Sequence, residues 1–162
     1  MPDEDSGYSV AMSCKVEQPL WYWLLPLSYA IHIAEEYWGG FVDWSARTSG
    51  TGLSLGVFLA TTSAGAILSL LGIFLSGRRK RQAWIPITMA SFFILNGLVH
   101  PAWTVTTHSY SPGLISGLLL WVPLGAAVLK RSSRIHSRSF LLKSAAGGIV
   151  FQAAVSLALR LS

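Results

Sequence analysis

The sequence predicts an all-α fold, a polytopic membrane helix bundle with about five transmembrane helices. Hydrophobic residues make up 52% of the 162 residues and charged residues only 12%, and the mean hydropathy is +0.50. A typical soluble domain carries about 25% charged residues. Apolar runs recur along the chain at lengths near the roughly 20 residues that cross a bilayer. Most of the 12 lysines and arginines gather in two short clusters beside such runs, which is typical of the loops of a membrane protein.

Five apolar segments are the predicted spans, and they follow a polar tail. Residues 1–18 are polar and acidic, whereas a secretory signal peptide would open with positive charge. We therefore expect a polar N-terminal tail at 1–18 and a single transmembrane helical domain at 19–162. The spans are expected at 20–39, 53–75, 84–103, 113–129 and 140–159. The fourth is short, and the polar residues of KSAAGG and a glutamine dilute the fifth.

The loops between these segments predict the orientation in the membrane. RRKR at 78–81 follows the second segment, and KRSSRIHSR at 130–138 follows the fourth. The loop after the first segment holds Asp43 and Arg47, and the loop after the third holds no lysine or arginine. Short positive loops stay in the cytoplasm. We therefore expect a cytoplasmic N-terminus and an external C-terminus, in a bacterial inner (cytoplasmic) membrane. Because the cationic clusters flank apolar runs, we expect no nucleic-acid partner.

Two polar motifs interrupt the apolar segments. In the first segment, HIAEE places Glu35 and Glu36 three and four residues after His32, on roughly one face of a helix. In the third segment, NGLVH places Asn96 and His100 four residues apart. At a rise of about 1.5 Å per residue, His32 lies about 18 Å and Glu36 about 24 Å from the cytoplasmic start of their segment. Asn96 and His100 reach the same depths in theirs, so the two motifs are predicted to meet in the outer half of the membrane.

These ionisable residues are candidates for function. Charged side chains inside a membrane are costly and commonly mark substrate or ion sites. Adjacent carboxylates repel each other, and no intramembrane lysine or arginine accompanies these two. A metal ion, or protons shared with the histidines, would balance their charge. One buried histidine or glutamate could merely join helices, but two carboxylates, two histidines and an asparagine exceed what packing requires.

Three short motifs resemble those of a known family. HIAEE at 32–36, NGLVH at 96–100 and Pro-Gly at 112–113 are similar to the motifs of the HXXEE-motif family of small integral membrane proteins. The resemblance extends from about residue 20 to about residue 130. It implies a membrane fold and the same five candidate residues, and it supplies no reaction. The family often has a threonine after Pro-Gly, and in this chain Ser116 takes that place.

The leading hypothesis is a metal-dependent membrane enzyme that acts on a lipidic or isoprenoid-like substrate. His32, Glu36 and His100 form a set of two histidines and one carboxylate, which suits Zn, Fe or Mn. Catalytic sites of this kind keep one coordination position open. We expect Glu36 to serve in catalysis as well as in ligation. Glu35 would be a second ligand or a base, and Asn96 would orient a ligand or bind substrate.

Other functions fit the same residues. A metal-free isomerase or cyclase of a lipidic substrate would use a buried glutamic acid as general acid and a histidine or the other glutamate as base. In that case Trp103 and Trp121 would bind substrate through cation–π contacts. His108 in the external loop would cover the site or contribute to substrate binding. A proton or ion relay and a non-catalytic membrane assembly subunit are further alternatives. Membrane lipids and a lipidic small molecule are the expected partners.

Overall fold

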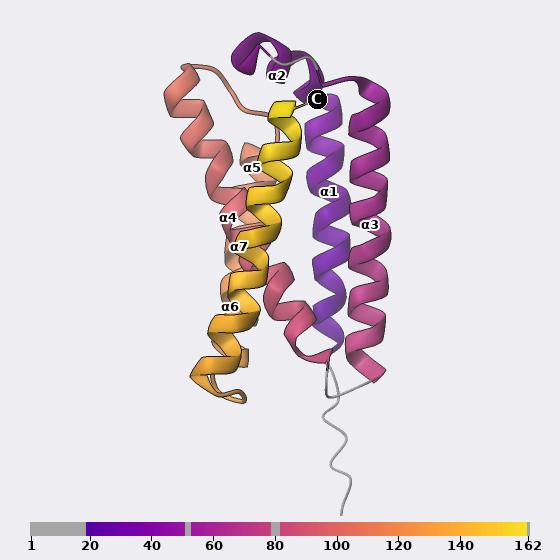
Figure 1. The fold of residues 1–162 in the computed structure, drawn as a ribbon, viewed down its shortest axis with the longest axis vertical. Coiled ribbons are helices and arrows are strands. Elements are labelled where there is room, and N and C mark those ends of the chain that lie inside the picture. The colour runs from indigo at the N-terminus through magenta and orange to yellow at the C-terminus, as the bar shows by residue number, and fades with distance from the viewer. Residues whose placement is uncertain (1–18, 51–52, 79–81, 162) are drawn as a thin grey trace, which may run out of the picture.

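The computed structural model describes residues 19–50, 53–78 and 82–161. The predicted tail at 1–18 lies outside these residues, as do residues 79–81 of the RRKR cluster. Helices fill nearly all of the described chain, and no strand occurs in it (Figure 1). In chain order the elements are η1 (Leu20–Trp23), α1 (Leu24–Trp38), α2 (Phe41–Ser49), α3 (Leu55–Arg78), α4 (Trp84–Thr107), α5 (Leu114–Ser116), the π-helical turn η3 (Gly117–Trp121), α6 (Val122–Ser132) and α7 (Arg138–Leu161).

Several helices are long and apolar enough to cross a membrane, which identifies an integral membrane protein. Four helices are long and apolar enough to cross a bilayer, namely α3, α4, α7 and the continuous run Leu114–Ser132 that joins α5, η3 and α6. Together η1 and α1 form a further helical run that stands beside α3 (Figure 1). A helix satisfies its backbone hydrogen bonds internally, as a lipid environment demands. The predicted bundle of about five helices is confirmed.

Helix α4 lies at the centre of the packing, in contact with α3, α6, η3 and α7. Small residues let its neighbours approach closely, since a Cβ added to Gly97 would lie 2.7 Å from the carbonyl oxygen of Gly117 in η3. A Cβ added to Gly148 of α7 would lie 2.6 Å from the carbonyl oxygen of Thr88. Close packing of this kind associates helices in a membrane, where lipid is as apolar as the side chains. It fixes α4, and with it the NGLVH motif.

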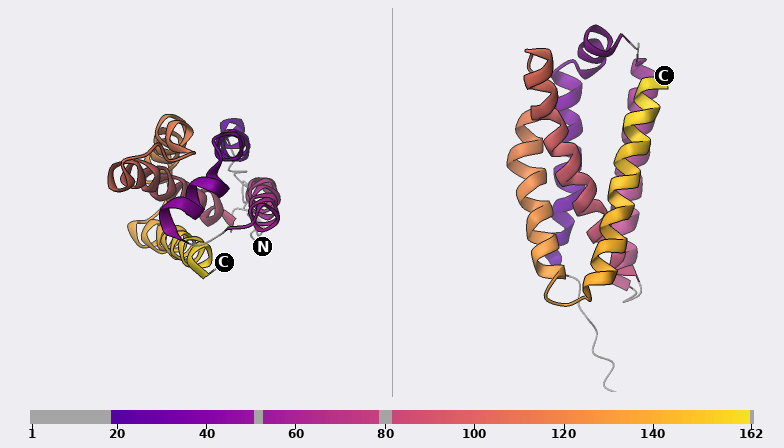
Figure 2. Two further views of the ribbon diagram at one scale, coloured as in Figure 1. Left: turned by 90° about the horizontal axis from the view of Figure 1, so that it is seen from above. Right: turned by 60° about the vertical axis from the view of Figure 1, so that its left-hand side comes forward.

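Helix α2 lies across the end of the bundle at which α1 ends (Figures 1 and 2). The connection after the first segment, in which Asp43 and Arg47 are expected, therefore contains a helix of its own. Gly40, in the left-handed region with φ 72°, turns the chain after α1. Trp44 then faces the bundle, where its ring meets Trp103 edge-on at 5.9 Å, while Asp43 remains exposed. This amphipathic helix covers the end of the molecule that holds the polar motifs.

Candidate functional site

The two polar motifs meet near the C-terminal end of α1. Helix α1 contributes His32 and Glu36, and helix α4 contributes His100. All three side chains are buried, with residue exposures of 1% for His32, 8% for Glu36 and 4% for His100. Buried ionisable groups are rare unless they are paired or bind a ligand. The convergence predicted from helical rise alone is therefore present in the folded chain.

The carboxylate of Glu36 lies between the two imidazoles. Its Oε1 is 3.6 Å from His32 Nε2 and 3.7 Å from His100 Nε2. The three potential ligand atoms lie within 4.8 Å of one another. In the part of the chain that the structure describes, no lysine or arginine forms an ion pair with this carboxylate. The two imidazoles are the groups that face this buried carboxyl group.

Two serines hold the imidazoles by their other nitrogen. The Nδ1 of His32 is hydrogen-bonded to Ser116 Oγ at 2.8 Å, and the Nδ1 of His100 to Ser111 Oγ at 3.1 Å. Both serines are buried. With Nδ1 protonated and donating to serine, each Nε2 would present a lone pair on the Glu36 side. Metal-binding histidines are oriented in this way by hydrogen bonds on the nitrogen that does not bind the ion.

Gly113 of the Pro-Gly motif closes the site. Its φ is 97°, in a region that residues with a Cβ rarely adopt. A Cβ at this position would lie 2.6 Å from His100 Cε1 and 2.8 Å from His32 Cε1. The preceding residue, Pro112, is fully buried and packs closely against Gly39 after α1. The third motif therefore brings backbone into direct contact with the histidines of the other two.

Glu35 faces a different part of the structure from Glu36. Its Oε1 accepts hydrogen bonds from the Ile115 backbone N–H at 3.0 Å and from the Tyr110 hydroxyl. Its Oε2 accepts from the Ser116 backbone N–H at 2.7 Å. Partial burial and the hydrogen bond to Glu35 raise the pKa of Tyr110 to about 12, so the phenol stays a donor at neutral pH. Glu35 thus ties residues 110–116, which carry both serines and Gly113, to α1.

Replacement of Glu35 by alanine should loosen residues 110–116. The change removes the acceptor of three hydrogen bonds, for which we expect a loss of roughly 1.5–4.5 kcal/mol in the free energy of unfolding. Because the serines would then orient the imidazoles poorly, we expect metal affinity to fall about 10- to 100-fold. Melting temperature and chelator competition in detergent measure both effects. Asp43→Ala, which removes an exposed carboxylate at the same end, is the matched control. Unchanged metal affinity in Glu35→Ala would contradict this positioning role.

The donor set fits a divalent transition metal. Two ligand atoms that are each about 2.1 Å from a tetrahedral ion lie about 3.4 Å apart, close to the 3.6 Å and 3.7 Å separations around Glu36 Oε1. His32 Nε2 is buried and has no hydrogen-bond partner among the described residues. Asn96 Oδ1 lies 3.0 Å from His100 Nε2, a hydrogen-bond contact that an ion bound to this nitrogen would replace. The set of His32, Glu36 and His100 could therefore hold a metal ion.

Trp103, His108 and Trp121 are the predicted substrate-binding residues, and only Trp121 contacts a residue of the His32, Glu36 and His100 cluster. Trp121, at the end of η3, stacks on His32 with ring centroids 3.7 Å apart and planes at 28°. Phe93 stacks on the same indole at 4.2 Å. Trp103 packs against α2 through its edge-on contact with Trp44, and His108 is exposed where it ends α4. Trp121 therefore contacts the buried group, while the other two residues lie toward the end of the bundle.

Sequence reasoning missed the role of Ser111. This residue precedes Pro-Gly and contacts His100 across the turn that follows α4. The signal in the sequence was its position, because Ser111 directly precedes the Pro-Gly motif and carries a hydroxyl that can bind a histidine. Ser116, which stands where the family often has threonine, keeps a hydroxyl that is hydrogen-bonded to His32.

Comparison with known proteins places the chain in a family. Searches of curated proteins and of solved structures found no match. One family matches residues 23–128, more than half of the chain, and its description is "Protein of unknown function with HXXEE motif". The matched region includes the HIAEE, NGLVH and Pro-Gly motifs that meet around Glu36. The chain belongs to this HXXEE family.

Proposed function

We propose that this protein is a metal-dependent membrane enzyme that acts on a lipidic substrate. The observation that carries the proposal is the convergence of His32 Nε2 and His100 Nε2 on one oxygen of Glu36, inside an apolar bundle. Three ligands that leave room for another group are the usual arrangement of a catalytic metal site. Two imidazoles and one carboxylate suit Zn, Fe or Mn. When bound, such an ion supplies Lewis-acid chemistry, which polarises a carbonyl or phosphoryl oxygen.

The chain's own residues would bind, orient and protect this site. Ser111 and Ser116 fix the imidazole rings through Nδ1. Trp121 covers one face of His32 and keeps water from it. Asn96, beside His100 Nε2, would orient a ligand or contact substrate. Glu36 is the carboxylate nearest both imidazoles, so it would also accept or deliver a proton during the reaction.

The surroundings of the site favour a lipidic substrate. The site lies among helices whose outer faces are apolar, and exposed large hydrophobic side chains cover α1, α3 and α7. A hydrophobic molecule reaches such a site from the bilayer without crossing water. The cationic loops favour an orientation with α2 and the site toward the external face of a bacterial inner membrane.

A metal-free acid–base enzyme is the second candidate. It is favoured by the 3.0 Å contact between His100 Nε2 and Asn96 Oδ1, which suits a protonated Nε2 that donates to the amide oxygen. With Nε2 protonated, His100 could not bind an ion through this nitrogen. A buried glutamic acid would then be the general acid, and a histidine or the other glutamate the base. This candidate predicts an isomerase or cyclase whose activity survives chelation.

Lipid turnover by the full chain in vesicles tests the proposal. Wild type, Glu36→Gln and Asp43→Asn would each be incubated with a total membrane lipid extract, with and without chelator, and followed by mass spectrometry. We expect a lipid species to be consumed by wild type and by Asp43→Asn, whose carboxylate is exposed, and not by Glu36→Gln or after chelation. Turnover that survives chelation would favour the acid–base enzyme. Identical lipid profiles in every sample would contradict catalysis.

A further inference from the structure

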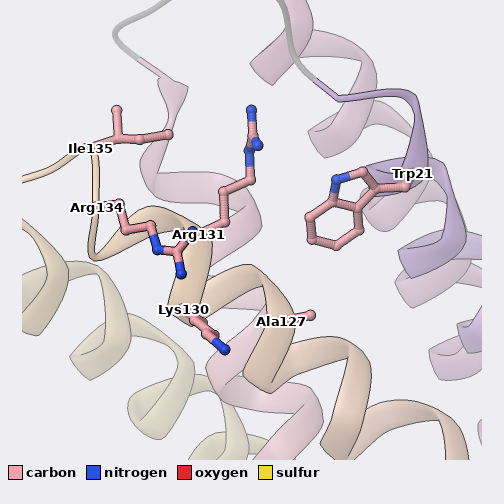
Figure 3. Close-up of a pocket in the computed structure, with 6 residues that line it drawn as sticks. All are labelled: Trp21, Ala127, Lys130, Arg131, Arg134 and Ile135. Carbon is pink, nitrogen blue, oxygen red and sulfur yellow. The ribbon is translucent and has the colours of Figure 1, made fainter.

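A basic pocket lies at the opposite end of the bundle from His32, Glu36 and His100. It has a volume of about 400 Å³ and forms where the end of α6 faces η1 (Figure 3). Ligand pockets in proteins typically measure about 300–1,000 Å³. The pocket is lined by Trp21, Ala127, Lys130, Arg131, Arg134 and Ile135. In Figure 3 the indole of Trp21 stands across the opening from the arginine side chains.

The positive charge of this pocket has no counterpart in the described structure. Lys130, Arg131 and Arg134 line it, and no carboxylate does. Within residues 19–50, 53–78 and 82–161 no ion pair to these three cations occurs. The acidic residues of that part of the chain belong to the last turn of α1 and to α2, at the other end of the bundle. Three cations that line one pocket with no carboxylate among its lining residues favour an anion there.

We propose that this pocket binds the phosphate group of an anionic phospholipid. Arginine presents a planar fork of N–H groups that matches phosphate oxygens, and lysine adds a compact positive charge. Basic pockets between transmembrane helices on the cytoplasmic side bind anionic lipid headgroups. The proposal concerns a binding site separate from the metal site and does not depend on it.

The position of Trp21 favours a lipid headgroup over a soluble phosphate. Tryptophan concentrates at the level of the lipid headgroups, where its ring contacts acyl chains and its N–H stays in a polar layer. Trp21 is held edge-on against Tyr22 with ring centroids 4.6 Å apart. Beside it, Leu20 and Leu24 are 85% and 47% exposed and offer apolar surface to acyl chains. A phosphate site and a chain-binding surface therefore lie next to each other.

Loop charge alone does not explain the pocket. The rule that keeps positive loops in the cytoplasm requires cations near the ends of spans, and it does not require them to share a cavity. Arg78 and Arg138 illustrate the difference, because both lie at the same end of the bundle, and neither lines the pocket. Arg78 stacks instead on the ring of Phe74 at 4.0 Å. Replacing these two arginines changes the net charge as much as replacing two arginines of the pocket does, and so provides a control.

Native mass spectrometry of the full chain in detergent tests the site. Wild type, R131Q/R134Q and R78Q/R138Q would be titrated with phosphatidylglycerol, with phosphatidylcholine and with inorganic phosphate. We expect wild type and R78Q/R138Q to bind phosphatidylglycerol in preference to phosphatidylcholine. R131Q/R134Q should bind phosphatidylglycerol about thirtyfold more weakly, since each cation near the headgroup contributes about a factor of five. Melting temperatures without lipid verify that the three proteins fold equally.

Three outcomes would overturn the proposal. Equal weakening in R131Q/R134Q and R78Q/R138Q would mean that net charge alone attracts the lipid. No preference of wild type for phosphatidylglycerol would mean that the pocket does not select an anionic headgroup. Inorganic phosphate that competes as well as the lipid would assign the pocket to a soluble phosphate. If R131Q/R134Q fails to fold, Lys130→Gln compared with Arg138→Gln makes the same test with one charge.

Discussion

His32→Ala is expected to abolish stoichiometric metal binding. The substitution removes one of three protein ligands, and loss of groups that only orient ligands already weakens metal binding about 10- to 100-fold. We therefore expect a fall of more than about 100-fold, measured by competition with a chromophoric chelator in detergent. The ligand role predicts the same loss for His100→Ala, because both Nε2 atoms face Glu36 Oε1.

His108→Ala is the matched control for this prediction. His108 is an exposed histidine near the same end of the bundle and lies outside the His–Glu–His group. It should bind metal as wild type does. Equal losses in His32→Ala and His108→Ala would show that metal binds to histidines at the surface and would contradict the buried site. Comparison of metal-free melting temperatures separates loss of a ligand from loss of the fold.

Gly113→Ala should damage both stability and metal binding. Its Cβ would lie 2.6 Å from His100 Cε1 and 2.8 Å from His32 Cε1, so both rings would have to move away from Glu36. The left-handed backbone adds about 1–2 kcal/mol of strain for a residue with a Cβ. We expect a lower melting temperature and a fall in metal affinity of about 100-fold or more, as for displaced ligands.

Gly40→Ala separates the two contributions. Gly40 also has a positive φ, 72°, but a Cβ there would meet nothing within 4 Å. This variant should show the backbone strain alone and keep the metal affinity of wild type. If Gly113→Ala and Gly40→Ala bind metal equally well, the contact of the Pro-Gly motif with the histidines does not shape the site.

The membrane bundle and the meeting of the motifs could be predicted from the sequence. Long apolar runs leave few alternatives to helices in lipid, and helical rise gives the depth of each polar residue. His32 and Glu36 on α1 and His100 on α4 meet as this reasoning predicts. This prediction needs no knowledge of side-chain packing, because α1 and α4 run in the same direction and equal residue counts therefore give equal depths.

The different roles of Glu35 and Glu36 could not be predicted in this way. Adjacent residues on a helix point about 100° apart, so only the positions of neighbouring segments decide what each carboxylate meets. Glu36 faces two histidines, whereas Glu35 meets the backbone of Ser116, 81 residues away in sequence. That contact depends on the left-handed turn at Gly113, which brings the chain back toward α1.

Helix α2 and the π-helical turn η3 were also beyond sequence reasoning. Residues 41–49 are too short and too polar for a span, and their helix forms because Trp44 can pack on Trp103 of α4. The π-helical turn has no sequence signature of its own, although such turns often occur at functional sites. Here it ends at Trp121, which it places against His32. Both features come from tertiary packing.

The metal content of the purified wild-type protein tests the central claim most directly. Mass spectrometry would count metal ions per chain in detergent, before and after treatment with a strong chelator. We predict about one Zn, Fe or Mn ion per chain, as one set of two histidines and one carboxylate can hold. We also predict that the ion's removal lowers the melting temperature, because a ligand stabilises the state that binds it. Protein that carries no metal, takes up none when it is offered and melts at the same temperature after chelation would contradict the metal site.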